Sequence, residues 1–220
     1  MIDLYDKIDI QITLNGKVSL IEHQQAWFYQ KDLAYKAAIL LQEYSGCTKG
    51  ANIKIKKVIP SGAGMGGGSS NAATVLIILN HLWETGLTTD ELLGLGAQLG
   101  ADVPFFIRGR NALVEGIGEI ITPIELPELY FVIIKPDFHA PTKDVFAALE
   151  LDFEQCNTKN ILTTQLISQK ENDLEAAVRK IYPQINDIFS ELNQYGKAVM
   201  TGSGSSIYLS FADKNSAKNV

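Results

Sequence analysis

The chain has 220 residues, of which 46% are hydrophobic and 20% charged, and it carries a formal net charge of −6 with a sequence pI near 5.1. This length and apolar content allow one large buried core or two smaller ones. The acidic balance argues against a nucleic-acid partner, and the absence of a bilayer-length apolar stretch argues against a membrane span.

Cysteine and histidine are sparse. Cys47 and Cys156 are too few for a disulfide framework and lie in no Cys-x-x-Cys pair, so we expect reduced thiols and a cytoplasmic protein. His23, His81 and His139 have no metal-ligand spacing. The sequence therefore predicts no metal site built from cysteine or histidine side chains.

The first elements show clear periodicity. Lys7–Leu14 alternates apolar and polar residues as a half-buried strand does, and Asn15–Gly16 marks a turn after it. Asp32 is expected to cap a helix that ends at Ser45–Gly46. Ala51–Ile59 alternates again and is predicted to be a strand that leads into the next segment.

A glycine-rich run follows this strand and precedes a predicted helix over Asn71–Glu84, whose residues are apolar almost all round, as in a buried helix. Glycine lets backbone N–H groups approach a ligand, and a helix N-terminus attracts anions. We therefore predict a phosphate-binding loop. It consists of Pro60, Ser61, Gly62, Ala63, Gly64, Met65, Gly66, Gly67, Gly68, Ser69 and Ser70.

Other glycine-rich nucleotide loops fit less well. A Walker loop requires Gly-Lys-Ser/Thr, whereas Gly68 is followed by Ser69. The dinucleotide pattern is met by Gly62, Gly64 and Gly67, but no acidic residue ends a second strand at the required distance. The lysine strand and catalytic motifs of protein kinases are absent from the sequence. A purely structural glycine turn is the remaining alternative.

A second feature follows a predicted helix that begins with the capping box Thr88–Glu91 and ends at Gly100. Asp102 comes directly afterwards, in a predicted tight turn before Pro104. A carboxylate there can serve as a catalytic base, or it can simply be a turn or capping residue.

The next segment predicts strands within Ala112–Ile121, broken by glycine, and a buried strand at Tyr130–Ile134. Proline is frequent between them, and we place a domain boundary within Pro123–Pro127. The predicted domains are residues 1–125 and 126–220.

The C-terminal part is expected to contain a helical region over Asn172–Asn193, bent near Pro183. Ala198–Phe211 is predicted to form two strands around a second glycine turn. A further helix is expected to begin near Asn215.

Three motifs together resemble the GHMP small-molecule kinases. They are Pro60–Ala73, Gly100–Phe105 and Met200–Ser206, and the similarity extends along the whole chain. The resemblance implies an α+β fold with two domains. The first is an ATP-binding domain, in which a glycine-rich loop leads into a buried helix, and the second is a smaller α/β sandwich. The resemblance is strongest to the branch of the family that serves non-mevalonate isoprenoid biosynthesis.

The resemblance also implies roles for individual residues. ATP with Mg²⁺ would bind at the loop Pro60–Ser70, and Asp102 would accept the proton of the attacking hydroxyl. A third motif, which otherwise reads as a plain hairpin turn, would close the site from the other domain; it consists of Thr201, Gly202, Ser203 and Gly204. Thr142 and Phe146 would lie near the diphosphate and the cytosine ring of the acceptor, although an aromatic residue such as Phe146 can equally belong to the core.

The implied partners are ATP and a cytidyl diphosphate sugar alcohol, with no nucleic acid or membrane, in a monomer or weak homodimer. Two alternatives stay open: another GHMP kinase acting on mevalonate, homoserine or a sugar, and a relative that binds nucleotide without transferring phosphate. Family members begin with a Pro-Ala-Lys strand and a Gly-Tyr-His turn, and this sequence opens downstream of both. We also expect a final helix and strand to be missing after Val220, and hence a fragment with little or no activity.

Overall fold

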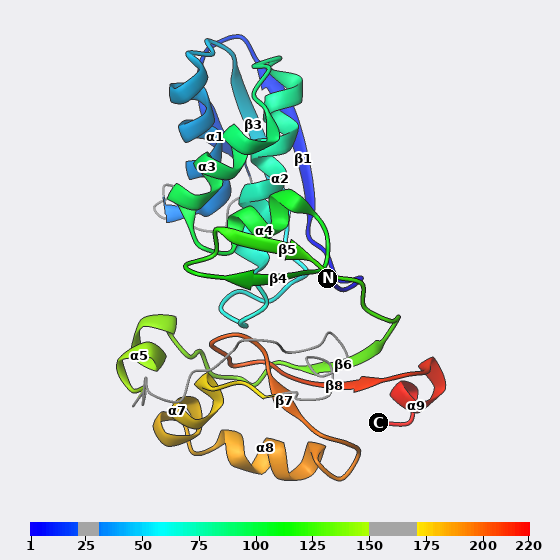
Figure 1. Cartoon of the computed structure of the whole chain (residues 1–220). Coiled ribbons are helices and arrows are strands. Elements are labelled where there is room, and N and C mark those ends of the chain that lie inside the picture. Colours follow the sequence, from blue (N-terminus) through cyan, green and yellow to red (C-terminus); the bar gives the residue numbers. More distant parts are fainter. Residues whose placement is uncertain (22–30, 150–170) are drawn as a thin grey trace. The chain divides into compact units, whose positions relative to one another are not determined.

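The computed structural model describes residues 1–21, 31–149 and 171–220, so His23 and Cys156 lie outside the described residues. The chain folds into two compact units, each with its own sheet and helices (Figure 1). Unit 1 contains Met1–Ile59 and Gly66–Ile124, and unit 2 contains Pro60–Met65 and Glu125–Val220. The glycine-rich run is thus divided between the two units.

The sheet of unit 1 has the order β1-β3-β2, formed by β1 (Lys7–Thr13), β3 (Gly50–Lys56) and β2 (Val18–Leu20). β1 runs antiparallel and β2 parallel to β3. The register places apolar pairs on one face of β1 and β3: Ile8 with Ile55, Ile10 with Ile53, and Ile12 with Ala51. The polar residues between them share the other face. The predicted alternation of both strands is therefore confirmed, because one face alone joins the core.

The helices α1 (Leu33–Ser45), α2 (Gly67–Leu82) and α3 (Thr89–Leu99) pack together alongside this sheet (Figure 1). Their apolar side chains and those of the sheet form one core. Its large fully buried members include Leu41, Ile53, Leu76, Leu79, Leu95 and Val103.

The predicted caps of these helices are present. The Asp32 side chain accepts a hydrogen bond of 2.8 Å from the Ala34 amide at the start of α1, and Gly46 ends the helix with a φ of 67°. Thr88 and Glu91 form the capping box of α3 through reciprocal hydrogen bonds. The sequence predicts these caps correctly because each depends on residues only a few positions apart.

The helix after the glycine run differs from its prediction in two respects. It begins at Gly67 rather than Asn71, so the last residues of the predicted loop, Gly67–Ser70, form its first turn. It is also not buried all round, since Ile77, Ile78 and Leu82 are 38%, 40% and 38% exposed. Apolar composition indicated burial, but only one side of the helix meets the core.

Asp102 lies in the predicted turn, which the Val103 amide closes with a hydrogen bond of 3.1 Å to the Gly100 carbonyl. A short helix, α4 (Val103–Arg108), begins directly after it. Proline is compatible with the first turn of a helix, because its missing N–H would have no helical partner there. The hairpin of β4 (Ala112–Glu115) and β5 (Ile120–Pro123) follows and confirms the strands predicted on either side of the glycines.

The sheet of unit 2 has the order β6-β8-β7, with antiparallel pairing throughout. It consists of β6 (Tyr130–Ile134), β8 (Ile207–Phe211) and β7 (Val199–Met200), which confirms the predicted strand pair around the second glycine turn. β6 was expected to be buried but is only half-buried, with Phe131 37% exposed.

The helices of unit 2 are α5 (Thr142–Ala147), α7 (Leu174–Ile181), α8 (Ile185–Leu192) and α9 (Lys214–Lys218). The helical region expected to bend near Pro183 is instead interrupted there, because proline restricts the preceding residue and lacks an amide donor. The core of this unit includes Val178, Ile185, Phe189, Met200, Ile207 and Leu209.

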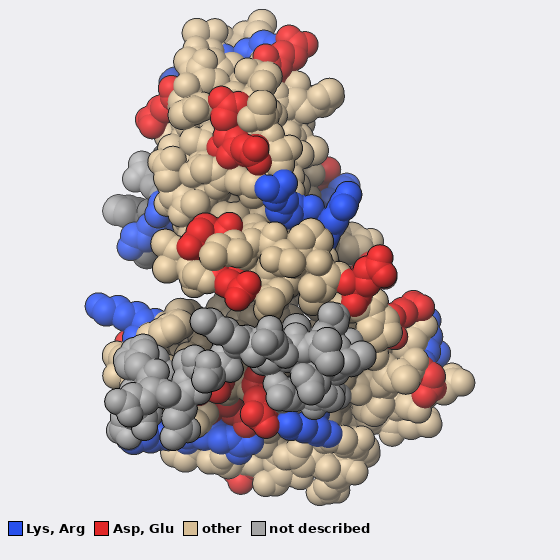
Figure 2. All heavy atoms as spheres, in the orientation of Figure 1, with Lys and Arg blue, Asp and Glu red and all other residues tan. Residues whose placement is uncertain are grey.

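The face of unit 1 visible in Figure 2 carries basic and acidic residues in separate small groups amid uncharged surface. This face therefore offers no broad basic surface of the kind that binds nucleic-acid backbones. Among the described residues, no helix combines the length and apolar character that a membrane span requires.

Candidate active site

The backbone of the glycine-rich run has a regular alternation. Gly62, Gly64 and Gly66 have φ angles of 64°, 71° and 66°, in the left-handed region that residues with a side chain rarely adopt. A backbone that alternates in this way can turn successive N–H groups toward one concave side, which suits an anion. The conformation thus explains why glycine stands at every second position.

The start of α2 supplies a further group of N–H donors. Gly66 occupies the N-cap position, where glycine has no side chain that could cap the helix. The Ser70 amide makes the first hydrogen bond of the helix, to the Gly66 carbonyl at 2.9 Å. The amides of Gly67–Ser69 come before it and can bind an external acceptor, and the helix dipole favours a negative one. Such a helix start suits an anion, as the prediction of a phosphate-binding loop requires.

Close packing holds this helix start in place within unit 1. A Cβ atom added to Gly66 would lie 2.9 Å from the ring of Phe106, which belongs to α4. One added to Gly67 would lie 2.9 Å from Cγ2 of Ile59 and 3.3 Å from Nζ of Lys57. The glycines therefore permit α4 and the segment after β3 to approach the start of α2.

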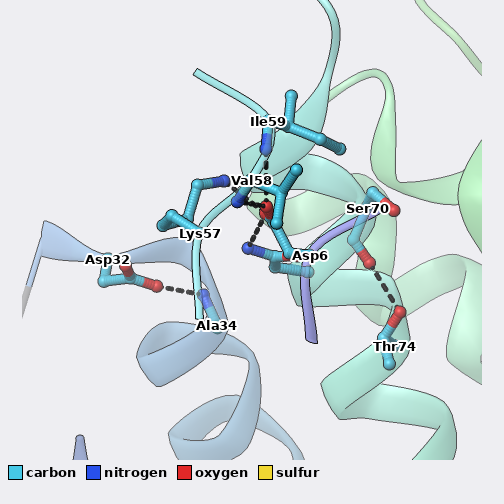
Figure 3. Close-up of polar contacts among 9 residues, drawn as sticks. Asp6, Asp32, Ala34, Lys57, Val58, Ile59, Ser70 and Thr74 are labelled. Atoms are coloured by element: carbon cyan, nitrogen blue, oxygen red, sulfur yellow. Dashed lines mark hydrogen bonds and ion pairs between the residues drawn. The ribbon is translucent and has the colours of Figure 1, made fainter. Parts of the chain in front are cut away.

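Asp6 is a residue of this region that sequence reasoning missed. Its side chain is fully buried, and its carboxylate accepts hydrogen bonds from the amides of Val58 and Ile59 at 2.7 and 2.9 Å, from Asn71 Nδ2 at 2.9 Å, and from Lys57 Nζ, with which it forms an ion pair (Figure 3). Burial acts to raise the pKa of Asp6, but these four donors together lower it below its ordinary value. The carboxylate is therefore ionised and fully partnered at neutral pH.

Asp102 stands immediately before α4. It is exposed, and its side chain makes no capping hydrogen bond to the helix that follows. The capping interpretation is therefore wrong, the turn interpretation is confirmed by the turn at Ala101 and Asp102, and the catalytic role stays a prediction. Gly118, in the turn between β4 and β5, has a φ of 107°, and a Cβ added to it would lie 2.3 Å from the Ala101 carbonyl oxygen. This turn thus lies against the backbone next to Asp102, a contact that the sequence did not indicate.

In unit 2, the first half of the glycine run packs against the predicted third motif. Thr201 Oγ1 donates a hydrogen bond of 2.9 Å to the Gly64 carbonyl, and the Ser206 amide donates one of 3.2 Å to the Ala63 carbonyl. Gly202, with a φ of 53°, approaches Gly64 so closely that an added Cβ would lie 2.7 Å from its carbonyl oxygen. The third motif is thus a hairpin turn that also packs against, and hydrogen-bonds to, the first half of the predicted phosphate loop.

The predicted acceptor residues also lie in unit 2. Thr142 Oγ1 is 2.8 Å from Ser203 Oγ, so the start of α5 is joined to the third motif. Phe146 is 57% exposed, which rules out the alternative that it belongs to the core; its stacking role stays a prediction. His139 Nδ1 lies 3.2 Å from the Gly62 carbonyl oxygen and thus contacts the glycine run, a contact that the sequence did not indicate.

Two adjacent buried serines after the third motif differ in hydrogen bonding and allow a matched test of what one buried hydrogen bond contributes to stability. Ser205 and Ser206 are both fully buried; Ser205 Oγ donates to the Phe138 carbonyl at 2.8 Å, whereas Ser206 Oγ has no hydrogen-bond partner among the described residues. We expect Ser205→Ala to lower the free energy of unfolding by about 1 kcal/mol, and Ser206→Ala to leave it unchanged or raise it. Urea unfolding followed by circular dichroism measures the free energy of unfolding of both variants. Equal losses of stability would show that the hydrogen bond from Ser205 to Phe138 does not stabilise the protein.

Within residues 1–21, 31–149 and 171–220, no group of three or more histidine, cysteine, aspartate or glutamate side chains is arranged to hold a metal ion.

The chain matches known proteins in both sequence and structure. The N-terminal domain of the GHMP kinases matches residues 32–110, and their C-terminal domain matches residues 159–220. A 4-diphosphocytidyl-2-C-methyl-D-erythritol kinase from Neisseria gonorrhoeae (strain NCCP11945) is 43% identical over 220 residues, which are 100% of this chain and 78% of the relative. The enzyme of the same name from Nitrosococcus oceani is 42% identical over 98% of this chain and 76% of its own.

Solved structures indicate the same family as the sequence matches. A crystal structure of 4-(cytidine 5'-diphospho)-2C-methyl-D-erythritol kinase superposes with a TM-score of 0.78 at 30% identity, over 97% of this chain and 80% of that one. A homoserine kinase from Cytophaga hutchinsonii, at 18% identity and a TM-score of 0.67 over 97% of this chain and 78% of its own, shares the fold. The chain therefore belongs to the GHMP kinases, within the branch of the 4-diphosphocytidyl-2-C-methyl-D-erythritol kinases.

Proposed function

We propose that the protein transfers the γ-phosphoryl group of ATP to the 2-hydroxyl of 4-diphosphocytidyl-2-C-methyl-D-erythritol, in non-mevalonate isoprenoid biosynthesis. The observation that carries this proposal is the 43% identity with a kinase of that name along all 220 residues. The two cysteines, of which neither lies in a Cys-x-x-Cys pair, agree with action in the cytoplasm.

The nucleotide would bind at the glycine-rich run. The alternating glycines and the uncapped start of α2 offer backbone N–H groups, which bind phosphate oxygens without the flexibility of long side chains. Mg²⁺ bound to ATP would neutralise the charge that develops on the transferred group. Phosphoryl transfer depends mainly on such placement and charge stabilisation.

Asp102 is the candidate base. Its carboxylate would take the proton from the acceptor hydroxyl as the new bond forms between that oxygen and the γ-phosphorus, while the bond from phosphorus to the β-phosphate oxygen breaks and ADP leaves. The Asp102 side chain supports this role because it is exposed and makes no capping hydrogen bond to α4, so its carboxylate is open to an acceptor hydroxyl.

The acceptor would be recognised by unit 2. The Thr142 and Ser203 hydroxyls can donate hydrogen bonds to a diphosphate, and the exposed ring of Phe146 provides a surface on which a cytosine can stack. These contacts would separate a cytidyl acceptor from the smaller alcohols used by other GHMP kinases.

ADP release from ATP and Mg²⁺ tests the proposal, with the cytidyl substrate compared against mevalonate, homoserine and galactose. Because the chain spans 78% of the Neisseria gonorrhoeae relative, the assay is run both with the 220 residues and with the chain extended to that relative's length. We expect turnover to depend on the cytidyl substrate. Turnover with another alcohol alone would reject the acceptor, and nucleotide binding without any turnover would favour a non-catalytic relative.

A further inference from the structure

We infer that Asp6 is a positioning residue for the nucleotide loop: its buried carboxylate ties the segment before the glycine-rich run to the helix after it. This inference rests on the proposed function, because it assigns a task to the loop. It concerns a residue outside every motif described above, near the start of unit 1 in the sequence.

The carboxylate divides its contacts between two segments. Oδ1 accepts from the amides of Val58 and Ile59, which directly precede the glycine-rich run. Oδ2 accepts from Asn71, a residue of α2 that is only 7% exposed, and from the Lys57 ammonium. One side chain therefore binds both flanks of the run (Figure 3).

The packing of the same segments explains why such a tie is needed. The segment that leaves β3 lies against the start of α2 so closely that position 67 admits only glycine without a shift of Ile59 or Lys57. Val58 and Ile59 lie beyond the last residue of β3, so their amides have no strand partner within this sheet and depend on Asp6. Without the carboxylate, two backbone donors would lose their acceptor next to the loop.

Asp6 does not bind phosphate itself, since a carboxylate repels a phosphate group. Its negative charge is balanced by Lys57 and dispersed over three further hydrogen bonds. A buried anion close to an anion-binding loop is tolerable only when paired in this way. Its contribution is therefore geometric: it fixes where the loop begins and where the helix starts.

Two substitutions test this inference in the protein used for the kinase assay. Asp6→Ala removes every acceptor, and we expect the KM for MgATP and the Kd of a fluorescent ADP analogue to rise about ten- to a hundredfold, with the KM of the acceptor alcohol changed less than about twofold. Asp6→Asn retains one oxygen for the Val58 and Ile59 amides but loses the ion pair. We expect it to weaken nucleotide binding by a smaller factor, about three- to tenfold.

Controls separate positioning from general damage. Asp9→Asn removes an equivalent charge from the exposed face of β1, where Asp9 pairs with Lys7 at 3.3 Å, and is expected to leave all constants unchanged. Leu95→Ala destabilises the core of unit 1 away from the loop and shows how much a lowered melting temperature alone affects the KM for MgATP.

The outcomes are distinguishable. If Asp6→Asn and Asp6→Ala bind nucleotide as the unchanged protein does, or lose no more than Leu95→Ala, the inference is wrong and the proposed function is untouched. If the unchanged protein binds no nucleotide, the proposed function is wrong, and the inference about Asp6 is wrong with it. If it binds nucleotide but uses another acceptor, the expected effect of Asp6 still stands and is measured by binding.

Discussion

Asp102→Asn is expected to lower kcat by about a hundred- to ten-thousandfold while the affinity for ATP stays nearly unchanged. Asparagine has the size of aspartate but cannot accept the proton of the attacking hydroxyl at neutral pH. The substitution should not disturb the fold, because the Asp102 side chain is exposed and makes no capping hydrogen bond to α4. Steady-state kinetics and titration with a fluorescent ADP analogue measure the two quantities separately.

A charge-matched control completes this test. Asp187 lies exposed in the first turn of α8, in the other unit, and Asp187→Asn removes the same charge without a catalytic consequence. If Asp102→Asn retains kcat within about twofold of the control, Asp102 is not the base. If it loses ATP affinity as strongly as kcat, the residue acts in nucleotide binding instead.

Gly64→Ala is expected to weaken nucleotide binding at least about tenfold and to destabilise unit 2. Gly64 has a φ of 71°, and a Cβ atom added to it would lie 2.2 Å from the Thr201 carbonyl oxygen and 2.9 Å from the Gly204 amide nitrogen. All of these atoms belong to the backbone, so no side-chain rotation can relieve the overlap. The glycine-rich run and the third motif would have to separate, and the hydrogen bond from Thr201 to Gly64 would be lost.

Two other glycines distinguish the sources of this effect. Gly86 has the same φ of 71° but no atom within 4 Å of an added Cβ, so Gly86→Ala reports backbone strain alone, about 1–2 kcal/mol of stability. Gly94 lies within α3 with neither constraint, and Gly94→Ala is expected to stabilise the protein by about 0.5–1 kcal/mol. Nucleotide binding should be unaffected in both. Equal binding by Gly64→Ala and Gly86→Ala would show that the close approach to Thr201 is unimportant.

Local sequence signals predicted most elements of unit 1. The alternation in β1, the cap at Asp32 and the capping box at Thr88 each involve residues adjacent in the sequence or within one helical turn, and the structure confirms them. The start of α2 was placed too late because glycine has a low helix propensity, and only packing against α4 and the segment after β3 determines that the helix begins at Gly67. Surface exposure of Ile77 and Ile78 was missed for a related reason, since composition does not say which side of a helix meets the core.

The candidate site divides in the same way. The sequence by itself determined the glycine spacing of the phosphate loop, the position of Asp102 after a helix, and the resemblance of three motifs to one kinase family. It could not reveal that Asp6 binds Ile59 and Asn71, from which it is separated by 53 and 65 positions, or that Thr201 binds Gly64 across 137 positions. Those contacts were decided by the tertiary structure, because a buried carboxylate or hydroxyl takes whichever donor or acceptor the fold brings to it, and nothing near it in the sequence identifies that partner.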